Sequence, residues 1–161
     1  MKAPERLSHV DETQQPRMVD VGEKPATRRT AQARAVVRFP PNVAATLRDA
    51  GHVTAKGAVM TVAHIAGVMG AKATPQLIPL CHPLSLDRCD LALRMEGDDI
   101  LIDCTVSCLG PTGVEMEALT GATVAALTVY DMCKALSHAI VIADVRLLAK
   151  SGGRREVSAT S

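Results

Sequence analysis

The chain has almost no aromatic side chains. Phe39 and Tyr130 are its two aromatic residues, and it contains no tryptophan. Proteins that read single-stranded nucleic acid stack the bases on aromatic side chains, so this composition disfavours such a role. Neither sign of charge is in excess, because 18 Lys and Arg face 17 Asp and Glu for a net charge of +1. This balance argues against general electrostatic binding to DNA or RNA, and we expect no nucleic-acid partner.

Long apolar segments are also missing. The longest weakly polar stretch, residues 57–71, would span about 22 Å as a helix, against roughly 30 Å of membrane hydrocarbon. The first residues contain no apolar core of a secretory signal. The five cysteines are odd in number and form no C-x-x-C pair, which favours reduced thiols. We therefore expect a cytoplasmic protein without a membrane partner.

The length of 161 residues fits one domain. We expect a flexible N-terminal tail at 1–17, a single α+β domain at 18–150 and a basic flexible tail at 151–161. Alternating apolar residues predict strands at 31–39, 89–95, 100–108 and 139–148, with a further short strand at 18–21. Helices are predicted at 43–47, 57–72 and 112–136, the last opened by a Thr112–Glu115 capping box. Three prolines, at 75, 79 and 83, predict an extended loop.

This order of elements is the split β-α-β pattern of ferredoxin-like domains, in which helices cover one face of an antiparallel sheet. Residues 118–130 of the last helix carry no charge. A helix that packs on one face of a sheet normally has a polar stripe on its solvent-exposed side. Two interpretations stay open and are compatible: the helix is covered by the one at 57–72, or it forms a subunit interface.

The charged residues of this helix lie at its two ends. Glu117 and Asp131 are about 21 Å apart along the axis and about 40° apart around it. They cannot both reach one reacting atom from one chain, so joint action requires an elongated substrate or two subunits. Acidic residues in the first turn also simply favour the helix dipole. Asp131 and Lys134 fit a surface ion pair, or a proton-transfer pair at the edge of an apolar face.

Two segments are candidates for anion binding. Lys56 and Gly57 precede a helix of small residues whose free amide groups suit an anion, although such a pair is often only a solvated turn. The segment Lys-Ser-Gly-Gly-Arg from Lys150 offers flexible amides beside cations, and it fits a phosphate cradle or a disordered tail. Cys81 and His82 are too few for a metal site and, as neighbours, badly placed as a thiol–base pair. His82 is a better candidate as a hydrogen-bond donor to a substrate, because three prolines fix its loop.

Five stretches, in order, resemble the cyclic pyranopterin monophosphate synthase family of molybdenum cofactor biosynthesis. They are MVDV at 18–21, LIPLCHPL at 77–84, TGVEMEALT at 112–120, VAALTVYDMCKA at 124–135 and VRLLAKSGG at 145–153. The resemblance implies a ferredoxin-like subunit of a homohexamer, a trimer of dimers. It implies conversion of (8S)-3′,8-cyclo-7,8-dihydroguanosine 5′-triphosphate, made from GTP by an upstream radical enzyme, into cyclic pyranopterin monophosphate and pyrophosphate. No cofactor is implied as required, and Mg²⁺ on the triphosphate or pyrophosphate is optional.

The resemblance also assigns site residues. It implies catalytic roles for Asp131, Lys134 and Lys56, and substrate binding by Leu80, Cys81, His82, Met116, Glu117, Arg29 and Lys150. We hypothesise that Asp131 acts as base and orienter, that both lysines donate protons and that Glu117 holds the edge of the base. The chain departs from the family pattern at Ala58, His64, Pro111 and Gly121. The alternatives are a catalytically weakened paralogue that acts as a binding or scaffolding subunit, and a metal- or thiol-dependent enzyme that uses Cys81 and His82.

Overall fold

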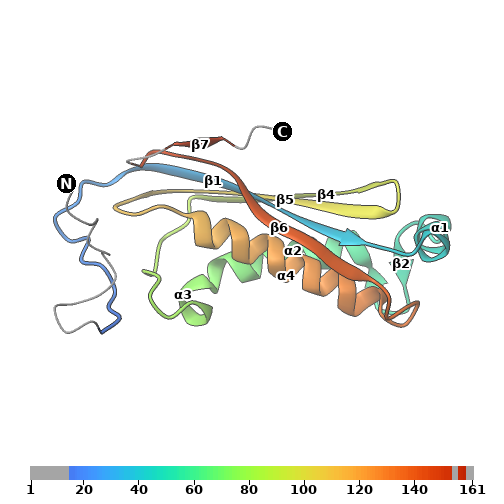
Figure 1. The fold of residues 1–161 in the computed structure, drawn as a ribbon. Helices are drawn as coiled ribbons and strands as arrows, with labels where there is room; N and C mark the ends of the chain where they lie inside the picture. Colours follow the sequence, from blue (N-terminus) through green and yellow to red (C-terminus); the bar gives the residue numbers. More distant parts are fainter. Residues whose placement is uncertain (1–14, 154–155, 159–161) are drawn as a thin grey trace, which may run out of the picture.

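The structure is a computed structural model that describes residues 15–153 and 156–158. A five-stranded antiparallel sheet carries the fold, in the order β4-β5-β1-β6-β7. Its strands are β1 (Thr27–Arg38), β4 (Arg88–Glu96), β5 (Asp99–Gly110), β6 (Val141–Ser151) and β7 (Val157–Ser158). The helices α2 (Val59–Lys72) and α4 (Glu115–Cys133) lie together across one face (Figure 1). The prediction of an α+β fold with an antiparallel sheet is confirmed.

Short elements complete the chain. The helix α1 (Pro41–Asp49) follows β1, and α3 (Thr74–Leu77) follows α2 directly. Between α1 and α2, β2 (Val53–Thr54) and β3 (Gly57–Ala58) form a two-stranded hairpin. This hairpin sits at the same end of the molecule as the C-terminus of α4 (Figure 1). Among the described residues, no helix is long and apolar enough to cross a membrane.

Strand β1 has two different faces because its residues alternate. Ala31, Ala33, Ala35 and Val37 are fully buried toward the helices, and the residues between them are only half-buried. β1 pairs with β5, whose residues at 100, 102, 104 and 106 are buried in the same core. An amphipathic strand needs one covered face and one wet face, which explains the single helical layer.

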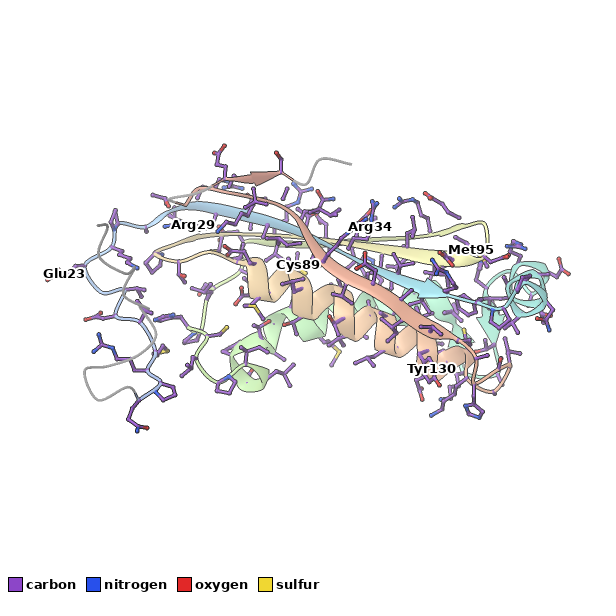
Figure 2. The ribbon with its side chains drawn as sticks, in the orientation of Figure 1. Glu23, Arg29, Arg34, Cys89, Met95 and Tyr130 are labelled. Carbon is purple, nitrogen blue, oxygen red and sulfur yellow. The ribbon has the colours of Figure 1, made fainter. Side chains whose placement is uncertain are left out.

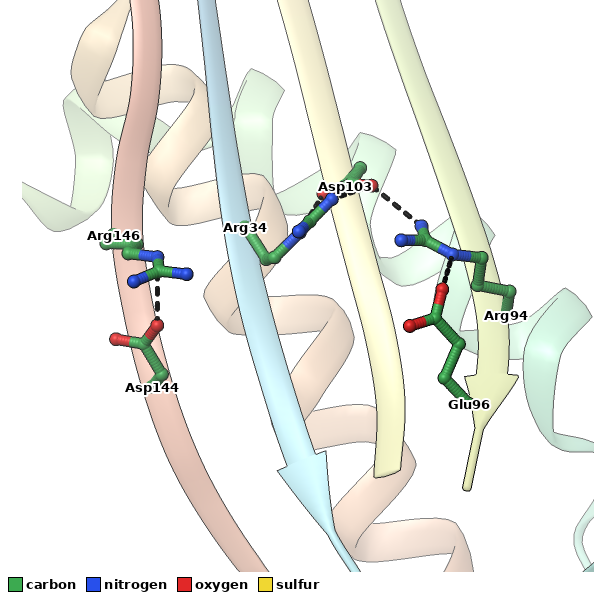
Figure 3. Close-up of polar contacts among 6 residues, drawn as sticks. All are labelled: Arg34, Arg94, Glu96, Asp103, Asp144 and Arg146. Carbon is green, nitrogen blue, oxygen red and sulfur yellow. Dashed lines mark hydrogen bonds and ion pairs between the residues drawn. The ribbon is translucent and has the colours of Figure 1, made fainter. Parts of the chain in front are cut away.

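The opposite face of the sheet is polar. Arg34 donates two hydrogen bonds to Asp103 across the β1–β5 pair, at 2.6 and 2.8 Å, and Arg94 of β4 donates a third at 2.8 Å (Figure 3). The Asp103 side chain is only 13% exposed. Both guanidinium groups therefore lower the pKa of Asp103, Arg34 more strongly. This network holds three neighbouring strands together on the side that no helix covers.

The two long helices touch where their residues are smallest. A Cβ atom added to Gly67 of α2 would lie 3.0 Å from the carbonyl oxygen of Gly121 in α4. One added to Gly121 would lie 2.7 Å from the Cys104 Sγ atom of the sheet beneath. Side chains at these positions would push the layers apart. The small residues thus set the spacing of the helical layer. Helix α2 covers one side of the uncharged segment 118–130 of α4, as the first interpretation predicted.

Four local predictions were wrong. Residues 18–21 form no strand. The helix expected from 57 begins at Val59, because residues 57–58 pair with β2 and Gly57 has a φ of 112°. Part of the loop expected to be extended forms α3, which accepts Pro75 in its first turn. The predicted capping box is absent, since Val114 occupies the N-cap of α4 without a side-chain cap.

The predicted tails lie mainly outside the described residues. Residues 1–14, 154–155 and 159–161 are not described, and the flexibility predicted for them stays a prediction. Within the predicted C-terminal tail, Ser151 ends β6 and residues 157–158 form β7, which pairs with Ala149 and Lys150. Lys150 therefore lies on a strand of the sheet.

Candidate active site

A cluster of three charged residues lies at the C-terminal end of α4. Lys56, in the turn between β2 and β3, donates hydrogen bonds to the Asp131 carboxylate at 2.6 Å and to the Asp131 backbone carbonyl at 3.0 Å. Lys134 reaches the other carboxylate oxygen at 2.9 Å. All three side chains are about half exposed, between 47% and 52%. The β2–β3 hairpin therefore brings to α4 a lysine that is 75 residues away in sequence.

The two lysines set the charge of this cluster. Their hydrogen bonds, that of Lys56 first, lower the pKa of Asp131 to about 2. The Asp131 carboxylate in turn raises the pKa of Lys134. Asp131 and Lys134 are therefore both ionised near neutral pH. A carboxylate with so low a pKa is a weak base, so this arrangement suits Asp131 better for orienting the two ammonium groups than for taking a proton.

A cavity of about 410 Å³ lies at the other end of α4. Its wall contains all five residues predicted at this end to bind substrate, namely Leu80, Cys81, His82, Met116 and Glu117. The loop before β4 supplies the first three and the first turn of α4 the other two. Val19 and Val21 close a further side of the cavity.

Burial and neighbouring groups shift the pKa of Glu117 and of Cys81 in this cavity, and His82 makes a hydrogen bond there. Glu117 is 3% exposed, and burial raises its pKa, opposed in part by a hydrogen bond from its own backbone. Burial, with the charge of Glu117 second, also raises the pKa of the Cys81 thiol. The His82 Nε2 atom lies 2.7 Å from the Val19 carbonyl oxygen. Because a carbonyl only accepts, Nε2 carries the proton in this contact. A protonated thiol argues against Cys81 as a nucleophile.

A second cavity, of about 520 Å³, adjoins the first. Lys24, Thr112, Gly113 and Glu115 line both cavities, so the two are halves of one cleft. Gly113 leaves room for the Glu115 carboxylate, which would collide with a side chain there. We call the larger half the cationic half and the one with Glu117 the Glu117 half.

The cationic half contains Arg29 and Lys150, both predicted site residues. Lys150 Nζ contacts Glu115 Oε1 at 2.7 Å. Arg29 donates to the carbonyl oxygens of Gly110 and Pro111 at 3.2 and 3.3 Å. The backbone of Gly152 and Gly153 completes the wall. Three cations against one carboxylate leave this half positive, which suits an anion with several charges.

The structure thus gathers the ten predicted site residues into two groups. Seven of them line the two halves of the cleft, and three form the cluster at the far end of α4. Arg29 and Tyr130, which precedes Asp131, mark these two ends in Figure 2. The rise of an α-helix separates Glu117 from Asp131 by about 21 Å. Among the described residues, no group of three or more His, Cys, Asp and Glu is arranged to hold a metal ion.

Several lining residues were missed by the sequence analysis. Val19, Val21 and Lys24 come from the segment before β1. This segment has no periodic pattern in its sequence that could have marked these residues as part of a site. Thr112 was assigned to a helix cap and lines the cleft instead. The fold and the cleft together define an α+β protein with a positively charged site for a multiply charged small molecule.

Comparison with known proteins agrees with this class. The model of the MoaC family matches residues 18–153. A cyclic pyranopterin monophosphate synthase of Xanthomonas axonopodis pv. citri is 53% identical over 96% of this chain and 94% of its own. One of Streptomyces griseus is 51% identical over 92% of this chain and 83% of its own. Molybdenum cofactor biosynthesis protein 1 of Drosophila melanogaster is 52% identical over 94% of this chain and 27% of its own. The chain belongs to the MoaC family.

Proposed function

We propose that this protein is a cyclic pyranopterin monophosphate synthase of molybdenum cofactor biosynthesis. It converts (8S)-3′,8-cyclo-7,8-dihydroguanosine 5′-triphosphate into cyclic pyranopterin monophosphate and releases pyrophosphate. The observation that carries this proposal is the pairing, in one cleft, of a cationic half with a half that holds the buried carboxyl group of Glu117. A guanosine triphosphate derivative has matching parts, because its phosphates need cations and its base edge needs a hydrogen-bonding carboxyl group.

The roles of the residues follow from this division. Arg29 and Lys150 bind the phosphate groups, and Glu117 holds the edge of the base. Leu80, Cys81, His82 and Met116 line the Glu117 half and bind the substrate there. Ring opening and reclosure move protons in both directions. Lys56 and Lys134 supply them, and the low pKa of Asp131 assigns that carboxylate to orienting the lysines.

The complete site requires two chains in this proposal. One protomer contributes its cleft, and its neighbour contributes the Asp131 cluster, so that the two ends of different α4 helices meet. Exposed apolar side chains on the helical layer support an interface there: Val62 is 39% exposed, Ile65 55%, Met69 64% and Leu127 54%. Such a surface is more apolar than a solvated helical layer needs to be. We propose a homohexamer built as a trimer of dimers.

The strand order β4-β5-β1-β6, with helices between the strands, supports a ferredoxin-like topology. The protein works in the cytoplasm on a substrate that an upstream radical enzyme makes from GTP. No cofactor is required, and Mg²⁺ accompanies the triphosphate or the released pyrophosphate only as an optional counter-ion.

An assay with the purified protein tests the function. Incubation with the cyclic dihydro-GTP intermediate is expected to yield cyclic pyranopterin monophosphate and one pyrophosphate per turnover, measured by chromatography and a phosphate-release assay. Absence of product from a correctly assembled protein would contradict the enzyme and support a scaffolding subunit. Full activity of Cys81→Ala in the presence of a chelator is expected, and loss of activity under those conditions would support the thiol or metal alternative instead.

A further inference from the structure

Two cysteines that the proposed reaction does not use lie close together on neighbouring strands. Cys89 of β4 (Figure 2) is paired with Val106, and Cys104 of β5 is paired with Leu91. Cys89 and Cys104 are therefore diagonal neighbours on the face of the sheet that the helices cover. Side chains in such diagonal positions can interact. Here the Cys104 thiol donates a hydrogen bond to the Cys89 sulfur, so the two sulfur atoms are already in contact.

The two thiols have different environments. Cys89 is half-buried, whereas Cys104 is fully buried. The hydrogen bond from Cys104, together with the positive charge of Lys72 at the end of α2, lowers the pKa of Cys89 against the effect of burial. The same hydrogen bond and burial raise the pKa of Cys104. A partly exposed thiol with a lowered pKa beside a second thiol is the arrangement that reacts reversibly with peroxides in redox-sensing proteins.

No other cysteine has this arrangement in the part of the chain that the structure describes. Burial raises the pKa of Cys81, Cys108 and Cys133, and no hydrogen bond from a second thiol offsets it. Cys81 is the most useful comparison, because it is half-buried like Cys89. The contact between two thiols is thus specific to the β4–β5 hairpin.

The position of Cys89 at the edge of the sheet allows a bond to form between the two sulfur atoms. A disulfide holds its two Cα atoms within about 7 Å of one another, which is shorter than some diagonal separations across two strands. Strand β4 is an edge strand that pairs with β5 alone. It can make the small shift that a disulfide needs, because only one of its sides is hydrogen-bonded to the sheet.

We propose that Cys89 and Cys104 are a redox-active pair that hydrogen peroxide converts into an intramolecular disulfide. The Cys89 thiolate attacks one oxygen of the peroxide, the O–O bond breaks, and Cys89 becomes a sulfenic acid. The hydroxide that leaves takes up the proton that Cys89 released. The Cys104 sulfur then attacks the Cys89 sulfur, the S–O bond breaks and the S–S bond forms. The second hydroxide takes the Cys104 proton, so two thiols lose two electrons and one peroxide is reduced to two water molecules.

Peroxide treatment of the reduced full-length protein, followed by peptide mapping under non-reducing conditions, tests the disulfide. The expected product is a single chain that has lost two hydrogen atoms and whose Cys89 peptide is linked to the peptide that contains Cys104. Cys89→Ser should abolish this link. Cys104→Ala should leave Cys89 as a sulfenic acid that dimedone captures. Cys133→Ser is the matched control at a buried thiol without a thiol partner, and it should oxidise like the unmodified protein.

Three outcomes of this experiment would overturn the proposal: absence of the link, its persistence in Cys89→Ser, or a link between two chains. Neither thiol lines the cleft, so formation of the disulfide does not depend on the proposed function. A protein that forms the disulfide but no product refutes the function alone. A protein that forms product but no disulfide refutes the redox-active pair alone.

Alkylation of the unmodified protein tests the reactivity of Cys89 without any substitution. At pH 7, iodoacetamide is expected to modify Cys89 at least about tenfold faster than Cys81, because the pKa is lowered for Cys89 and raised for Cys81. Peptide mapping at a series of reaction times measures both rates. Equal rates, or a faster Cys81, would contradict the assignment of Cys89 as the thiol that peroxide attacks.

Discussion

Glu117 and Asp131 lie fourteen residues apart on the same helix, and their carboxyl groups are in opposite environments. Glu117 is buried, and burial raises its pKa. Asp131 is half exposed between two lysines, which lower its pKa to about 2. One helix therefore carries a carboxyl group with a raised pKa at one end and a carboxyl group with a lowered pKa at the other. The contrast leads to different predictions for the two residues.

Replacement of Asp131 by asparagine is expected to lower kcat by about 100-fold or more, because Lys56 and Lys134 lose the group that orients them. The melting temperature should change by no more than about 2 °C, since exposed ion pairs stabilise proteins little. Asp90→Asn is the matched control, because Asp90 forms an exposed ion pair with Arg88 on β4. Steady-state kinetics and thermal melts check both. An acid limb of the rate profile near pH 4–5 that disappears in Asp131→Asn would contradict the low pKa.

Replacement of Glu117 by glutamine is expected to stabilise the fold while impairing catalysis. The raised pKa means that the charged form of Glu117 is penalised in the folded protein. The penalty is complete above the folded pKa, shrinks as pH falls below it and vanishes below the unfolded pKa of about 4.3. We expect Glu117→Gln to melt roughly 2–4 °C higher at pH 8, corresponding to about 1 kcal/mol. The difference should disappear toward pH 4. Glu96→Gln, at an exposed position of β4, should show no such gain.

Replacement of Asp103 by asparagine is expected to destabilise the sheet by about 1–2 kcal/mol at pH 7, since Arg34 and Arg94 lose their shared carboxylate. The pKa of Asp103 is lowered in the folded state. Its contribution is therefore complete above the unfolded pKa of about 3.9 and is lost as pH falls through the lower folded value.

Urea unfolding at a series of pH values measures this effect. The difference between Asp103→Asn and the unmodified protein should be constant from pH 5 to 8 and shrink below about pH 4. Asp99→Asn, four residues earlier on β5 with the more exposed partner Arg38, should cost less. A difference that persists undiminished at pH 2 would show that the network stabilises the sheet through packing and not through charge.

Replacement of Gly121 by alanine is expected to destabilise the fold by about 1–3 kcal/mol, because the new Cβ atom meets the Cys104 Sγ atom. Removing that sulfur with Cys104→Ala should relieve much of the cost, so the two substitutions are expected to be non-additive in a double-mutant cycle. Chemical denaturation of the four proteins measures the coupling. Strictly additive costs would mean that contacts with α2 set the helix spacing and that Cys104 does not.

The sequence analysis predicted best those elements whose own residues determine them. The alternation from Ala31 to Val37 defines β1 because each buried face needs every second residue. The Asp131–Lys134 pair follows from helical spacing alone. Only the resemblance to a family placed Lys56 in the same site as Asp131 and Lys134. Its contact with Asp131 spans 75 residues and depends on the tertiary fold.

Two of the four wrong predictions, the capping box and the strand at 18–21, concern residues that have distant partners in the fold. Glu115 pairs with Lys150 at 2.7 Å and so does not serve the capping box with Thr112. The Val19 carbonyl accepts from His82, and residues 18–21 join no sheet. No local pattern reports a partner that lies 35 or 63 residues away. Lys24, which lines both halves of the cleft, was missed because no local pattern marks its position.

The length of α4 has a genetic consequence. Each catalytic site in the proposed dimer combines the cleft of one protomer with the Asp131 cluster of its neighbour. Glu117→Ala therefore damages the part of the site that one protomer supplies, and Asp131→Asn damages the part that the other supplies. A hybrid dimer then keeps one site free of both substitutions. Co-expression of the two inactive alleles should restore about one quarter of normal turnover if the dimers form at random. Co-expression of two alleles that are both mutated at the same end of α4 should restore no activity.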